Sequence, residues 1–140
     1  SLSRSFRELS NASPALQSPI DINDRSVEVI ARTDDVLMCR FAELCEKPRS
    51  AHDYIEIARE YHAVLLADVP ALGASNDDAA RRFINLVDEF YDRSVKLIIS
   101  AERPILELYD QGRLNFEFQR TQSRLQEMQS REYLAREHRP

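Results

Sequence analysis

Two polar residues that each follow a short, mostly apolar run, Asp68 and Ser100, are the first candidates for chemistry. Residues 64–67 and 95–99 have the length and composition of strands that are covered on both faces. Nucleotide hydrolases often hold magnesium with a carboxylate in such a place and sense a phosphate with a neighbouring polar group. The alternative is structural: Asp68 caps the turn that follows it, and Ser100 only ends its strand.

A helix between these two runs determines whether Asp68 and Ser100 meet. Asp77 and Asp78 favour a helix start, and apolar residues then recur every three or four positions to about Arg93. These apolar residues are Ala80, Phe83, Ile84, Val87, Phe90 and Tyr91. Two strands joined by such a helix form a parallel pair with a right-handed crossover. We therefore expect Asp68 and Ser100 side by side at the carboxyl edge of a sheet, where open parallel sheets bind ligands.

A second candidate is the pair Arg120 and Arg124, which a spacing of four residues places on one side of a C-terminal helix. Arginines paired in this way can hold a phosphate, or the carboxylates of a partner, through two hydrogen bonds each. The alternative is a solubilising surface in which Glu117 and Glu127 are their local partners.

Other kinds of site lack their residue patterns. A phosphate-binding loop needs several glycines before a Lys and a Ser or Thr, and the chain has only Gly73 and Gly112, neither of which precedes a lysine. The four residues that could bind zinc are spaced too far apart for a structural site. They are Cys39, Cys45, His52 and His62. We assign no catalytic residue, no metal site and no cofactor to this chain.

Composition indicates a water-soluble domain. The chain has 140 residues, a formal net charge of -5 and 31% charged residues of both signs, which argues against a nucleic-acid partner. No apolar run has the length of a membrane span, and we expect a cytoplasmic protein. The first residue is Ser1 rather than Met, so we expect a processed product or a fragment.

The predicted organisation is an N-terminal turn and linker over residues 1–24, followed by a single α/β domain over residues 25–140. Residues 11–24 are rich in Ser, Asn and Pro and are predicted as a loop. The domain is predicted to begin with a β-hairpin of residues 27–31 and 36–41, which precedes a small, mostly parallel sheet with flanking helices.

The remaining elements follow from local signals. Residues 41–45 are predicted to close the second strand of the hairpin, and Ser50 and Asp53 form a capping box that opens a helix. A short helix is predicted from Pro104 to Gly112. Residues 114–118 alternate as a strand does, and a weakly anchored helix is predicted over residues 121–136.

Three segments carry a resemblance to a known family. They read CEKPRSAHDYIEIAREYHAVLLADVP from Cys45, DDAARRFINLVDEFYDRSVKLIISAE from Asp77 and FEFQRTQSRLQEMQSREYL from Phe116. In this order they resemble the C-terminal part of the ZapE-type ATPases. These are AAA-like P-loop proteins of bacterial cell division, with mitochondrial relatives linked to protein quality control at the inner membrane.

The resemblance implies a function that this chain does not carry alone. The phosphate loop and the magnesium motif of the family lie upstream of the matched region, so ATP and Mg are expected only in the full-length protein. The implied partners are the upstream nucleotide-binding domain, neighbouring subunits, or a division or membrane-associated protein. The link of the mitochondrial relatives to the inner membrane implies a second candidate location for this protein, peripheral to that membrane.

Three hypotheses follow. The first is the C-terminal portion of a ZapE-like ATPase that serves packing, oligomer or partner contacts. The second is a stand-alone protein-interaction module without ATPase activity. The third, which has the least support, is an enzyme with its own hydrolytic site at Asp68 and Ser100. Ligand or partner contact is assigned by hypothesis to Asp68, Ser100, Arg120 and Arg124.

Overall fold

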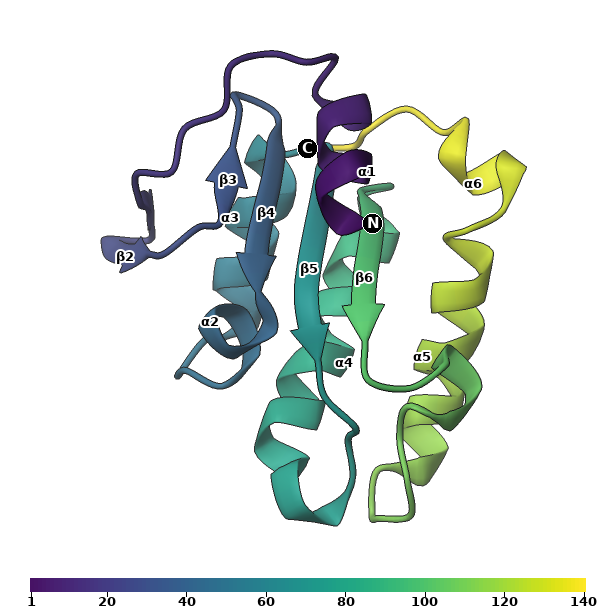
Figure 1. Cartoon of the computed structure of the whole chain (residues 1–140). Helices are drawn as coiled ribbons and strands as arrows, with labels where there is room; N and C mark the ends of the chain where they lie inside the picture. Colours follow the sequence, from purple (N-terminus) through teal and green to yellow (C-terminus); the bar gives the residue numbers. More distant parts are fainter.

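The computed structural model describes residues 1–140 and contains a four-stranded sheet with the strand order β3-β4-β5-β6 (Figure 1). The strands are β3 (Ala31–Arg32), β4 (Val36–Arg40), β5 (Ala63–Val69) and β6 (Lys96–Ala101). Strands β4, β5 and β6 are parallel, and β3 is antiparallel to β4. The predicted fold class, α/β with a small, mostly parallel sheet, is confirmed.

Two helical crossovers connect the parallel strands. Helix α3 (Ala51–Glu60) joins β4 to β5, and α4 (Asp77–Asp92) joins β5 to β6 after a short 3-10 turn, η1 (Ala74–Asn76). The capping box that opens α3 is present, since the Ser50 N–H donates to Oδ2 of Asp53 at 2.9 Å. The predicted strand-helix-strand unit of β5, α4 and β6 is also confirmed.

The sheet has two unequal apolar faces because side chains alternate along each strand. Leu37, Cys39, Val64, Leu66 and Leu97 belong to a core of 32 buried residues that α3 and α4 cover. The opposite face forms a second cluster made of Val36, Met38, Ala63 and Leu65. Helix α1 (Leu2–Leu9) covers this second cluster through Phe6 and lies in front of the sheet in Figure 1.

The predicted loop over residues 11–24 is wrong at its end, where strand β1 (Ile20–Ile22) pairs with β2 (Arg25–Val27). Asn23 and Asp24 join the two strands with φ angles of 51° and 66°. Positive φ at both central residues is the geometry of the tight two-residue hairpin turn that twists with its strands. The predicted hairpin of residues 27–31 and 36–41 is present as β3 and β4, but its first strand begins only at Ala31, and Val27 belongs to β2.

Two further predictions of strand are wrong. Residues 41–45 form the short helix α2 (Phe41–Cys45), and residues 114–118 lead into the helix α5 (Asn115–Glu127). The short helix predicted after Pro104 is a single 3-10 turn, η2 (Ile105–Glu107), and the chain ends with α6 (Arg131–Leu134). None of the helices is both long and apolar enough to pass through a membrane.

The C-terminal helices are better anchored than the sequence predicts. Phe118 stacks on Phe83 of α4 and on Tyr109, with ring centroids 6.3 and 5.1 Å away. Tyr133 is buried, and its hydroxyl donates to the Val95 carbonyl at 2.7 Å. Helix α5 therefore extends the layer of helices beyond α4, at the β6 side of the sheet (Figure 1).

Candidate functional site

The carboxyl edge of the sheet brings Asp68 and Ser100 together, as the parallel crossover predicts. The backbone N–H of Asp68 donates to Oγ of Ser100 at 2.9 Å. The contact exists because the β5–β6 register shifts between Leu66 and Val69, so that two residues of β5 face one residue of β6. Asp68 is the bulged residue, with a φ of 65°.

This bulge determines which groups remain free. The side chain of Asp68 is 75% exposed, and its Oδ2 lies 3.5 Å from Nη1 of Arg40 at the end of β4. The Ser100 hydroxyl oxygen already accepts a backbone hydrogen bond, which gives Ser100 a part in holding the bulge. A cavity of about 320 Å³ opens here between the two strand ends and is also lined by Glu102. The edge therefore presents carboxylates, with Arg40 as the nearest cation.

Arg120 and Arg124 share one carboxylate across the seam between α4 and α5. Nη2 of Arg120 lies 3.3 Å from Oδ2 of Asp88, and Nη1 of Arg124 contacts Oδ1 of the same side chain. The alternative of a solubilising surface had Glu117 and Glu127 as their local partners, but Glu117 pairs with Arg81, and Glu127 pairs with Arg136. Asp88 was missed as a partner because it lies more than 30 positions away in the sequence.

The two arginines differ in how firmly they are held. The side chain of Arg124 is 25% exposed, and its guanidinium also lies 4.8 Å from the centroid of the Tyr91 ring. The Tyr91 hydroxyl donates to Oε2 of Glu127 at 2.7 Å, and this hydrogen bond raises the pKa of Tyr91. The side chain of Arg120 is 60% exposed and has Asp88 as its one ion-pair partner. Of the two, Arg120 is the one with hydrogen-bond donors to offer to another molecule.

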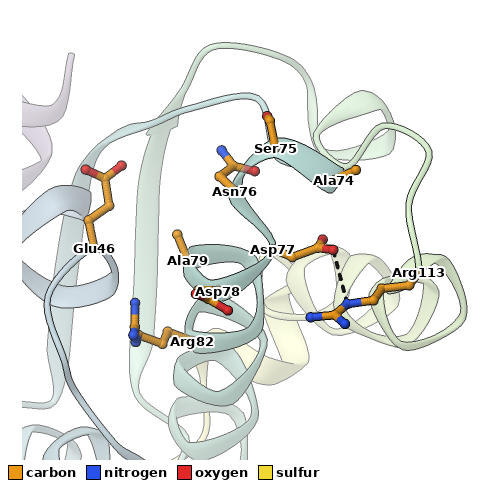
Figure 2. A pocket seen from close by; sticks show the side chains of 9 residues that line it. All are labelled: Glu46, Ala74, Ser75, Asn76, Asp77, Asp78, Ala79, Arg82 and Arg113. Atoms are coloured by element: carbon orange, nitrogen blue, oxygen red, sulfur yellow. Dashed lines mark ion pairs between the residues drawn. The ribbon is translucent and has the colours of Figure 1, made fainter.

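A wide, open cavity of about 730 Å³ lies at the start of α4, and Figure 2 shows the side chains that line it. Asp77 pairs with Arg113 at 3.2 Å and accepts a hydrogen bond from the Tyr109 hydroxyl at 3.0 Å. Arg82 donates to the Cys45 carbonyl at 3.1 Å, and so it does not form the ion pair with Asp78 that its spacing would favour.

The charges of this cavity argue against a phosphate site. Asp77 and Asp78 occupy the first turn of α4, where the helix dipole would otherwise favour a bound anion. Sequence reasoning identified these two residues as a helix start but did not predict a cavity, because Glu46 and Arg113 reach it from distant segments.

Neither cysteine has the environment of a nucleophile or a metal ligand. Cys39 and Cys45 are both free and buried, and burial raises the pKa of each thiol to about 12. The structure contains no group of three or more His, Cys, Asp or Glu residues that could hold a metal ion.

Comparisons with known proteins identify relatives along almost the whole chain. Residues 1–137 match the family model described as AFG1-like ATPase. The cell division protein ZapE of Escherichia coli K12 is 52% identical over 119 residues, which cover 85% of this chain and 32% of that protein. The lactation elevated protein 1 homolog B of Danio rerio is 38% identical over 109 residues, which cover 78% of this chain and 22% of that protein. No solved structure matches the chain. The chain thus spans about a third of the length of ZapE, and less of the fish protein.

Proposed function

The chain belongs to the AFG1-like ATPase family, and we propose that it is the C-terminal portion of an ATP-hydrolysing protein whose phosphate-binding loop and magnesium ligands lie outside residues 1–140. One observation carries this proposal: the family match extends from residue 1 to residue 137, yet the chain spans only 32% of ZapE. The sequence of the chain supports it, since two glycines without a following lysine cannot form a phosphate cradle.

Within such a protein, this portion serves packing, oligomer or partner contacts. A core of 32 buried residues gives it a stable framework, and the side chains of Asp68 and Arg120 lie at the surface, where a neighbour can reach them. ATP and Mg bind to the remaining part of the full-length protein. The partners are the upstream nucleotide-binding domain or neighbouring subunits, and no nucleic acid takes part.

The name of the bacterial relative suggests a process for this protein. ZapE is a cell division protein, and we extend that role to this chain by its 52% identity. A division protein, or a protein associated with the membrane, is then the wider partner. The location that fits this role is cytoplasmic, with a peripheral place at the inner membrane.

Among the candidate residues, Asp68 and Arg120 have the exposure that a contact requires. Their side chains are 75% and 60% exposed, and each has a single ion-pair partner in the chain. Arg120 is the residue that would reach a phosphate or a carboxylate across an interface, because a guanidinium can make two parallel hydrogen bonds. Arg124 supports it by holding Asp88 in place, and Ser100 supports Asp68 by holding the bulge.

The test uses the complete reading frame. We expect a phosphate-loop sequence upstream of Ser1, and we expect the full-length protein to hydrolyse ATP in the presence of Mg. A control variant in which the loop lysine is replaced by alanine should lose this activity. A reading frame without a phosphate loop, and a protein without turnover, would favour a stand-alone interaction module instead.

A further inference from the structure

The sheet has two edges, and a further backbone segment pairs with only one of them. At the first edge β3 is two residues long, and Leu16 exchanges two backbone hydrogen bonds of 2.8 and 2.9 Å with Arg32. At the second edge β6 is six residues long, and no strand or isolated bridge pairs with its outer side. Very short edge strands and covering segments prevent sheets from pairing with other chains. Strand β6 is not short, and no strand or bridge pairs with its outer side, although α6 reaches the carbonyl of Val95 just before it.

The outer side of β6 offers a row of backbone hydrogen-bonding groups. The Lys96 N–H donates to the His62 carbonyl at 2.8 Å, and the Glu102 N–H donates to the Val69 carbonyl at 2.9 Å. The backbone N–H and C=O groups of the even-numbered residues of β6 therefore point toward β5. Those of the odd-numbered residues point away from β5, because these groups alternate in direction along a strand. The outward residues are Leu97, Ile99 and Ala101.

After Lys96 at its start, the side chains of β6 lack the features that protect an edge. Between Lys96 and Glu102 there is no charged residue and no proline, and the bulge that could twist this edge away lies on β5. Ile98 and Ile99 keep part of their surface exposed although they are large and apolar. This edge is therefore suited to an added strand whose own side chains are apolar on at least one face.

We propose that the edge of β6 accepts one further β-strand, supplied by the segment of the full-length polypeptide that leads into Leu2. This proposal rests on the proposed function, because it requires polypeptide before residue 1. The position of α1 supports this occupant: Leu2 packs against the same apolar cluster as Ile98 of β6. Figure 1 shows the N-terminus beside β6, so a preceding segment would emerge next to the open edge. At about 3.3 Å per residue, about six residues would cover β6.

Hydrogen exchange at single-residue resolution in the full-length protein tests this proposal. The inward amides of Ile98 and Ser100 are the matched reference, because they lie in the same strand. We expect the outward amides of Leu97, Ile99 and Ala101 to exchange within about tenfold of that reference. Exchange of the outward amides more than about tenfold faster would overturn the proposal.

Two further measurements test whether a paired strand causes the protection and whether that strand belongs to the same molecule. Ala101→Pro removes one outward N–H at an exposed position, and it should release Leu97 and Ile99 from protection, whereas Ala101→Ser should not. If the proline variant does not fold, the exchange pattern of the unmodified protein still decides whether the outer side of β6 is protected. Protection that disappears on dilution, together with loss of a dimer, would assign the edge to a second copy and contradict the stated occupant.

ATP hydrolysis by the same preparation separates this proposal from the one on which it rests. Turnover with an unprotected β6 edge would leave the ATPase assignment in place and remove the added strand. A protected β6 edge without turnover would support the added strand and remove the ATPase assignment.

Discussion

Replacing Arg124 with alanine should destabilise the fold, and replacing Arg120 should not, although both arginines bind Asp88. Arg124 is 25% exposed and Asp88 is 23% exposed, so their hydrogen bond is partly shielded from water. Hydrogen bonds to charged groups contribute about 1.5–3 kcal/mol, and a cation over an aromatic ring adds about 0.5–1 kcal/mol. After allowance for the remaining exposure, Arg124→Ala should cost about 2 kcal/mol. Arg120 is 60% exposed, and a surface ion pair of this kind contributes about 0.5 kcal/mol or less.

Urea denaturation of the 140-residue chain measures this difference. With a slope of about 2 kcal/mol per molar, Arg124→Ala should lower the midpoint by about 1 M, and Arg120→Ala by about 0.25 M or less. Arg131→Ala is the matched control, since Arg131 is an exposed helical arginine without an ion pair. Asp88→Ala should cost at least as much as Arg124→Ala, because it leaves two like charges one helical turn apart.

The same variants of the full-length protein address the contact role of Arg120. We expect Arg120→Ala to lower ATP turnover while the denaturation midpoint stays nearly unchanged. A midpoint for Arg120→Ala as low as that for Arg124→Ala, with normal turnover, would refute the division of roles between the two arginines.

Two further predictions concern the framework and its dependence on pH. Phe83→Ala should lower the free energy of unfolding by about 3–5 kcal/mol, because Phe83 is fully buried between Phe41 and Phe118. Phe116→Ala is the control, since Phe116 is 82% exposed. Equal effects of the two substitutions would contradict the described packing of Phe83. Burial alone would raise the pKa of Asp53, but hydrogen bonds from Ser50, Asn23 and Arg25 outweigh it and lower that pKa. The stabilisation from Asp53 is therefore present above the pKa that this residue has in the unfolded chain, and it is lost as pH falls through its lower pKa in the folded state. The free energy of unfolding should therefore fall less steeply with acid in Asp53→Asn than in the unmodified chain. Identical slopes would contradict this prediction.

The central strands and crossovers are predictable from sequence because their signals are local and agree with one another. The apolar run before Asp68 and the apolar stripe of α4 each favour one structure. The meeting of Asp68 with Ser100 then follows from the parallel direction of the two adjacent strands. The bulge that joins them is not predictable, since it depends on a shift in pairing between β5 and β6.

The incorrect predictions arise where a short run of apolar residues fits both the two-residue period of a strand and the helical period of about 3.6 residues. Leu114, Phe116 and Phe118 alternate as in a strand, yet Leu114 and Phe118 are also four positions apart, and only these two are buried. Their spacing continues to Thr121 and Leu125, which establishes the helix. In the N-terminal region, Asn23 and Asp24 between alternating residues are a signal for a tight hairpin turn.

The partners of the charged residues could not be predicted at all. Arg120 and Arg124 reach Asp88, and Arg113 reaches Asp77, only because α4 and α5 pack side by side. Side chains that meet across more than 30 positions leave no periodic pattern in the sequence.

Calorimetric titration of ATP with Mg tests the central claim most directly, because that claim places the nucleotide site outside this chain. The full-length protein should bind ATP, and the 140-residue chain should give no heat of binding under the same conditions. Micromolar binding to the chain that Asp68→Ala abolishes would contradict the account and would place a nucleotide site at the carboxyl edge of the sheet.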